Sequence, residues 1–246
     1  MRHVLAHKPA RRQVDAPGAY GARMLAQPAA SLTDLALGIV VLVLAVRLRG
    51  TPSVPRYWLA LFWWTAVAAL AGAVHHAVLV RWDRAAAISW AVISVMVVIA
   101  VSYLLAATVR EVLGPGKVRV FWLLRSAGLL AYLAAAATGH AGVTALLSCE
   151  SLTMLSVLGL WVMAALRGHP RARPVLVAVG ASGAAAVAKA LPSGVLGLDP
   201  TSAYHLAQIV GMVLLFMAVS RRIGQETEEA HQSRNGVRTT GAGTPT

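Results

Sequence analysis

The sequence predicts an all-α fold, a membrane-embedded bundle of seven transmembrane helices. Apolar residues make up 58% of the chain and charged residues 13%, and the mean hydropathy is +0.67, a balance that excludes a soluble domain and a disordered chain. Apolar runs near the roughly 20 residues that an α-helix needs to cross a bilayer recur along the chain. They are rich in alanine and leucine and too long for barrel strands, which favours helices.

The seven predicted spans are joined by short loops into one domain, residues 31–222. The first span is the shortest, and the seventh begins with Asp199 and Pro200, which are typical of an N-cap and a first helical position. The second opens with aromatic rings that favour the headgroup level, namely Tyr57, Trp58, Phe62, Trp63 and Trp64. The spans cover residues 32–46, 57–80, 85–109, 118–138, 143–166, 174–191 and 200–219.

Two polar tails flank this domain. Residues 1–30 are polar and basic, contain no apolar stretch long enough for a signal peptide, and are predicted to be disordered. Residues 223–246 are polar and short of large apolar side chains, which is typical of a disordered tail.

The formal net charge of +13 lies largely in loops beside the spans and forms no aromatic-interleaved patch, so no nucleic-acid partner is expected. The positive-inside rule then predicts a multi-pass protein of the cell membrane with a cytoplasmic C-terminus and an outside N-terminus. The basic residues of the N-terminal tail oppose this orientation, unless later loops dominate or translation starts at Met24 instead of Met1. The loop and tail cations that set the orientation are Arg47, Arg49, Arg56, Arg110, Lys117, Arg119, Arg167, Arg171, Arg173, Arg221 and Arg222.

Ionisable residues lie near the outer ends of five predicted spans. Such residues are costly inside a membrane and usually face the bundle interior or a wet cavity. Simpler roles exist for some of them: Asp34 follows Ser31 at capping-box spacing, and Lys189 can snorkel from a helix end. Adjacent residues differ by about 100° around a helix, so at most one of the two histidines faces inward. The set comprises Asp34, His75, His76, Glu150, Lys189 and His205.

Glu150 and His205 give the strongest indication of a site. No basic residue lies three or four positions from Glu150, so its partner must come from another helix. Ser202, His205 and Gln208 recur every third residue and form one polar stripe pointing into the bundle. With Lys189, Ser202 and Gln208 are expected to form a polar network around the histidine.

One hypothesis for this set is a zinc site. Neutral imidazole is the commonest metal ligand, and His205 with His75 or His76 would form its core. Glu150 or Asp34 would act as a ligand or as the general base. Zinc lowers the pKa of a bound water to about 7, which would create a nucleophile beside a lipid substrate.

The alternative is a non-enzymatic membrane protein that uses the same polar set for binding, transport or pH sensing, because histidine titrates near physiological pH. An opsin-like Schiff base is disfavoured because Lys189 lies near a helix end. Arg125, inside the fourth span, either snorkels beside Trp122 or forms a salt bridge with Glu111.

A histidine late in the second of seven helices, and "YHLAQIVGMVLLF" at the start of the seventh, resemble the superfamily of alkaline ceramidases and progestin/adiponectin receptors. The resemblance implies zinc bound by histidines of helices two and seven and hydrolysis of a lipid amide. The chain departs from the family's motifs: Ile209 stands four residues after His205, where the family has a second histidine, and Ala71 or Gly72 replaces its helix-two serine. A distant bacterial-type relative is implied, in line with the alanine- and arginine-rich composition.

Overall fold

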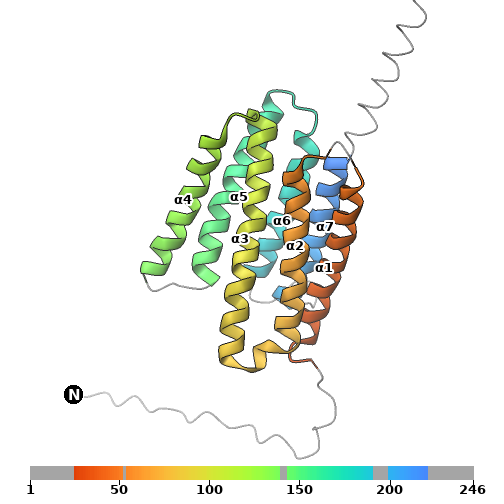
Figure 1. Ribbon diagram of the computed structural model, residues 1–246, viewed down its shortest axis with the longest axis vertical. Coiled ribbons are helices and arrows are strands. Elements are labelled where there is room, and N and C mark those ends of the chain that lie inside the picture. The colour runs from red at the N-terminus through yellow and green to blue at the C-terminus, as the bar shows by residue number, and fades with distance from the viewer. Residues whose placement is uncertain (1–24, 52–53, 139–142, 191–198, 221–246) are drawn as a thin grey trace, which may run out of the picture.

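The computed structural model describes residues 25–51, 54–138, 143–190 and 199–220, and the regular secondary structure of this part of the chain is entirely helical (Figure 1). A short 3-10 helix, η1 (Leu79–Arg81), joins the second helix to the third. The predicted tails fall largely outside the described residues, as do both candidate start methionines. The α-helices are α1 (Pro28–Arg49), α2 (Arg56–Ala77), α3 (Asp83–Leu113), α4 (Val118–Ala137), α5 (Val143–Leu166), α6 (Ala172–Ala190) and α7 (Pro200–Ser220).

The first helix is longer than predicted. It has 22 residues and begins at Pro28, within the segment predicted to be a disordered tail. Proline is favoured at a first helical position, and the two alanines that follow are strong helix formers, so the helix starts before the apolar run does. Hydropathy alone places the boundary too late for this reason.

Six helices are long and apolar enough to cross a membrane: α1, α2, α3, α4 over Val118–Ala135, α5 over Ala145–Leu166, and α7. The apolar stretch described in α6 is shorter, Ala172–Ala184. The described part of the chain is therefore that of a multi-pass membrane protein, because helices of this length satisfy their own backbone hydrogen bonds in lipid.

The helices form a closed ring with one helix outside it. Following the contacts, the ring runs α1, α2, α3, α5, α6, α7 and back to α1, and α4 packs against α3 and α5 from outside (Figure 1). Large apolar side chains of α4 are exposed, among them Leu123, Leu130 and Leu133. An exposed apolar surface of this kind suits lipid contact.

Aromatic side chains of α2 contribute to the core. Trp58 is 1% exposed and Phe62 0%, and the Phe62 ring meets Phe216 of α7 edge-on with centroids 6.4 Å apart. The indole N–H of Trp58 donates to Glu111 Oε2 at 3.1 Å. Helix packing buries these two rings and supplies a partner for the indole, so they contribute to the core of the bundle.

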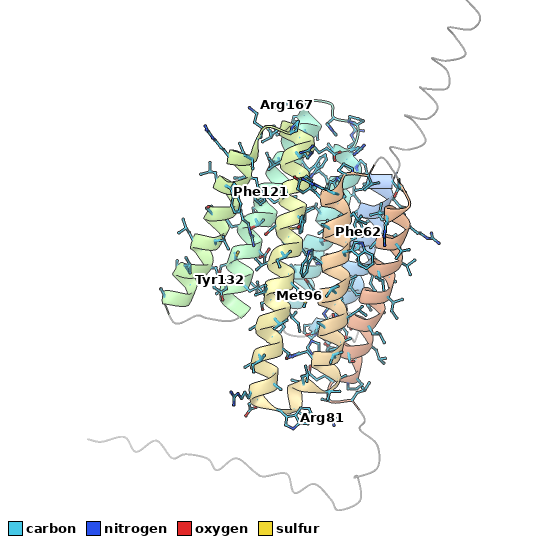
Figure 2. All side chains as sticks on the ribbon, viewed as in Figure 1. Phe62, Arg81, Met96, Phe121, Tyr132 and Arg167 are labelled. Carbon is cyan, nitrogen blue, oxygen red and sulfur yellow. The ribbon has the colours of Figure 1, made fainter. Side chains whose placement is uncertain are left out.

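The bundle has two chemically different ends, marked by Arg167 and Arg81 (Figure 2). We call the end formed by the α1–α2, α3–α4 and α5–α6 connections the basic end, and the opposite end the histidine end. At the basic end the described cations are Arg47, Arg49, Arg56, Arg110, Lys117, Arg119, Arg167, Arg171 and Arg173. The histidine end holds the start of α1, the end of α2 and the start of α7.

Candidate functional site: a carboxylate between two histidines

Three helices bring Asp34, His76 and His205 together at the histidine end, and we call these residues the Asp–His cluster. Asp34 lies in the second turn of α1, His76 in the last turn of α2, and His205 in the second turn of α7. Backbone hydrogen bonds fix the first two helices to each other, since Ala26 N donates to Ala77 O at 2.9 Å and Gln27 N to His76 O at 3.0 Å.

The Asp34 carboxylate lies between the two imidazole rings. Its Oδ1 is 3.1 Å from His205 Nε2, and its Oδ2 is 3.8 Å from His76 Nε2. The side chains of Asp34 and His205 are each 7% exposed and that of His76 is 16% exposed. The cluster is therefore largely buried. A proton or ion shared by these atoms interacts with them more strongly in this buried position than it would in water.

The other ring nitrogens determine which atoms carry protons. His205 Nδ1 lies 3.1 Å from Thr33 Oγ1, and the Thr33 hydroxyl proton is already donated to Ala29 O at 2.9 Å. With its hydroxyl proton donated to Ala29 O, Thr33 accepts a hydrogen bond from His205 Nδ1–H. His76 Nδ1 lies 2.6 Å from Gln27 Oε1, an amide oxygen that can only accept.

Both neutral imidazoles consequently present an Nε2 lone pair toward a carboxylate. Two acceptors facing one another repel unless a proton or cation lies between them. A protonated histidine, a protonated Asp34 or a bound cation each resolves the conflict. When both rings carry their proton on Nδ1, the cluster therefore requires a shared proton or a cation between Asp34 and the imidazoles.

Gly72 makes room for the carboxylate. A Cβ atom at Gly72 would lie 2.5 Å from Asp34 Oδ2, so any larger residue would displace the carboxylate. Gly72 and His76 are four residues apart and share one face of α2, which is how this helix presents both a space and an imidazole to Asp34. Ser31, one turn before Asp34, donates to Ala73 O at 3.0 Å and holds α1 against the same face.

The predicted capping role of Asp34 is wrong. The helix starts at Pro28, so Asp34 lies beyond its first turn. Asp199 does act as the predicted cap of α7: its Oδ1 accepts from the backbone N–H groups of Thr201 and Ser202, both at 3.0 Å. A second hydrogen bond, from the Ser202 hydroxyl to Oδ2, is 2.5 Å long and is the main cause of the lowered pKa of Asp199.

His75 has a separate environment. Its Nδ1 lies 2.7 Å from Ser89 Oγ, whose hydroxyl proton is donated to Ala85 O, so His75 Nδ1–H also donates. The ring packs edge-on to His76, with centroids 5.0 Å apart, and against Trp90. His75 is buried and His76 is half-buried.

The three residues of the predicted polar stripe on α7 contact different partners. The Ser202 hydroxyl donates to the cap residue Asp199, and His205 Nε2 lies 3.1 Å from Asp34 Oδ1. Gln208 Nε2 donates to Tyr204 Oη at 3.2 Å. Lys189 lies in the last turn of α6, and its side chain is outside the described part.

Glu150 pairs with Arg125, a partner that the sequence did not indicate. Arg125 Nη2 lies 3.5 Å from Glu150 Oε1, Nη1 donates to Thr153 Oγ1 at 2.8 Å, and Nη2 also approaches Val98 O at 3.3 Å. Arg125 is 2% exposed, so it does not snorkel. The partner predicted for Arg125 was also wrong, because Glu111 pairs with Arg171 at 2.6 Å.

Within the described residues, no group of three or more histidine, cysteine, aspartate or glutamate side chains is arranged to hold a metal ion. The proposed zinc ligands are therefore only partly assembled here: His76, His205 and Asp34 meet, whereas Glu150 is engaged by Arg125. A depression of about 360 Å³ lies at the histidine end and is lined by Gln27, Pro28, Ala29, Ala30, Asp199 and Thr201. It adjoins both a hydrogen-bond partner of His76 and the cap of α7.

Sequence reasoning did not identify Thr33, Gln27 and Gly72 as parts of the site. The spacing of Gly72 and His76 on one helix face was a usable signal for a close approach at that point. That Asp34 fills the space beside Gly72 could be identified only from the packing of α1 on α2.

Comparison with known proteins gives a family and no function. Searches of curated proteins and of solved structures find no match. A model for a family of unknown function, DUF6962, matches residues 29–223, which include the Asp–His cluster, the Arg125–Glu150 pair and all seven helices. On this match the chain belongs to the DUF6962 family.

Proposed function

We propose that this protein is a seven-span protein of the cell membrane in which the Asp–His cluster holds a proton or small cation and links it to binding or transport. The observation that carries the proposal is the Asp34 carboxylate between two Nε2 atoms whose rings each place Nδ1 within hydrogen-bond distance of an oxygen. Such an arrangement is sensitive to the loss of one proton. Ionisable groups withdrawn into a membrane bundle commonly mark ion or proton pathways.

The position of the cluster suits exchange with the aqueous phase. His205 is five residues from the start of α7, about 8 Å along the helix axis. The depression lined by Gln27, Pro28 and Asp199 lies at the same end. The cations of the basic end support a cytoplasmic position for that end by the positive-inside rule, which puts the histidine end outside and exposes the cluster to external pH.

The test is the pH dependence of thermal stability in detergent, measured for the full chain. We expect the thermal midpoint of the wild type to fall as pH rises through about 5 to 8, the range in which histidine charge usually changes. Asp34→Asn should flatten this dependence, because an amide N–H can donate to His205 Nε2 without an added proton.

Asp199→Asn is the matched control: it changes a carboxylate at the same end to an amide that still caps a helix. It should keep the wild-type slope. An unchanged slope in Asp34→Asn would refute the proton-linked proposal.

A zinc-dependent lipid amide hydrolase is the second candidate. It is favoured by the meeting of His76 of α2 with His205 of α7, whose ring centroids are 6.4 Å apart, because the resemblance implies zinc between these two helices. Each ring also donates its Nδ1 proton to an oxygen, as metal-ligating histidines do. The ligand set is incomplete among the described residues, so no catalytic step is derived.

Metal content separates the two candidates. Mass spectrometry of detergent-purified wild type and His205→Ala should find about one zinc per chain, lost in the variant, if the hydrolase candidate is correct. Hydrolysis of lipid amides would then be assayed. Absence of stoichiometric metal from the wild type would eliminate this candidate and leave the proton-linked proposal.

A further inference from the structure

A groove of about 430 Å³ opens between α3 and α4 at the basic end, which is opposite the end that holds the Asp–His cluster. Phe121 of α4 marks its position toward the Arg167 end of the bundle (Figure 2). Apolar and aromatic side chains make up much of its wall, including Ile99, Tyr103, Ala106, Val118, Phe121 and Trp122. Trp122 and Val118 are each 59% exposed, so the α4 wall opens toward the lipid.

The groove has the length of one lipid leaflet. On α3 its lining residues recur three or four positions apart from Ile99 to Arg110, a single face of the helix. Eleven steps along the helix, at about 1.5 Å each, span roughly 16 Å. This is about half of the roughly 30 Å hydrocarbon thickness of a bilayer, which matches one acyl chain.

The groove ends in positive charge. Arg110 and Lys117 line it where α3 turns into α4. The Arg110 guanidinium lies over the Tyr57 ring at 5.6 Å, and that of Arg56 lies at 5.3 Å from the same ring. Tyr57 also lines the groove, so these cation–π contacts hold both guanidinium groups near its mouth.

No described carboxylate neutralises these cations. Glu111 is the carboxylate in the described part of the basic end, and it already accepts from Arg171 at 2.6 Å and from Trp58 at 3.1 Å. Arg110 and Lys117 are both exposed. Among the described residues, the mouth of the groove therefore carries net positive charge beside an apolar channel.

We propose that this groove binds one anionic phospholipid from the leaflet at the basic end. Its phosphate and charged headgroup pair with Arg110 and Lys117, and an acyl chain lies between Ile99 and Phe121. Basic pockets between transmembrane helices are suited to anionic headgroups, and cytoplasmic leaflets are rich in them. The proposal does not depend on the function proposed for the Asp–His cluster.

Native mass spectrometry of the full chain, exchanged into detergent with equal amounts of phosphatidylglycerol and phosphatidylcholine, tests this proposal. The wild type should retain phosphatidylglycerol several-fold more than phosphatidylcholine. The double variant Arg110→Gln/Lys117→Gln should lose this preference. Arg167→Gln/Arg173→Gln, which removes the same charge from the same end but not from the groove, should keep it.

Two further arms separate the headgroup from the groove. Ala106→Trp fills the channel and should reduce retention of both lipids, even if the charge variants fail to fold. Inorganic phosphate without lipid should leave the thermal midpoint unchanged, whereas phosphatidylglycerol should raise it. Equal retention of the two lipids by the wild type, or equal loss of preference in both double variants, would overturn the proposal.

Discussion

The Asp34 carboxylate fills the space beside Gly72, where a Cβ atom would lie 2.5 Å from its Oδ2. This relationship between α1 and α2 sets where the cluster forms, because the carboxylate can reach His76 and His205 only if α2 lacks a side chain at this point.

Gly72→Ala should lower the free energy of unfolding by about 1–3 kcal/mol, the usual cost of overpacking. The affected atom belongs to a short side chain held by two histidines, so it has little room to move. Gly159→Ala is the control, since a Cβ there meets nothing within 4 Å; alanine favours helix at such a site by up to about 1 kcal/mol. Denaturant unfolding in detergent would measure both. Equal stability of the two variants would contradict this packing.

Thr33→Val should weaken the pH dependence of the thermal midpoint. The hydroxyl accepts the His205 Nδ1 proton, and its loss lets the ring place its proton on Nε2 instead, facing Asp34. The ring then donates to the carboxylate without an additional proton. Valine has a similar shape, so a retained midpoint with a shallower slope is expected. A slope as steep as that of the wild type would show that Thr33 does not fix the tautomer.

Arg125 and Glu150 should be energetically coupled. Glu150→Gln leaves the buried Arg125 charge unpaired, and breaking a buried pair in this way costs about 3–5 kcal/mol. The double variant Arg125→Gln/Glu150→Gln should lose less stability than the two single variants together, by about 0.5–3 kcal/mol.

A double-mutant cycle of Arg125→Gln with Glu111→Gln distinguishes the observed Arg125–Glu150 pair from the Arg125–Glu111 pair that the sequence suggested. Glu111 is held by Arg171, so its effect should add to that of Arg125→Gln within about 0.5 kcal/mol. Strong coupling between Arg125 and Glu111 would contradict the structure.

Asp199→Ala should destabilise the start of α7 by about 1 kcal/mol, as expected for loss of an N-cap, whereas Asp199→Asn should have little effect at neutral pH. The Ser202 hydroxyl and backbone N–H groups lower the pKa of Asp199 in the folded state. The ionised carboxylate thus stabilises the fold at neutral pH, and this contribution is lost as pH falls through the lowered pKa. Unfolding measured from neutral to acid pH should show the wild type losing its advantage over Asp199→Ala only in acid. An advantage that persists at the lowest pH would argue against the charged cap.

Helix positions followed from the sequence because hydrophobicity and helix signals act locally. The fifth span was predicted at its observed bounds, Val143–Leu166, and the cap at Asp199 could be identified from neighbouring letters alone. The predicted helix boundary was wrong where helix-favouring residues extend beyond the apolar run, as at the start of α1 at Pro28. The shared level of Asp34, His76 and His205 also followed from counting residues inward from helix ends.

The choice of which polar side chains meet depends on how the helices pack. Glu150 lies at a similar depth by residue count, yet it faces Arg125 on the outer helix α4 and not the histidines. Rotation and packing order around the ring determine this choice, and they arise from contacts such as Gly72 with Asp34 between residues distant in the chain. Local sequence patterns were sufficient to predict helices, membrane embedding and a set of ionisable residues at one end of the bundle. The pairing of carboxylates with cations depended on the order in which the helices close the ring, because a charge withdrawn from water is stabilised by whichever partner lies within a few ångströms in space.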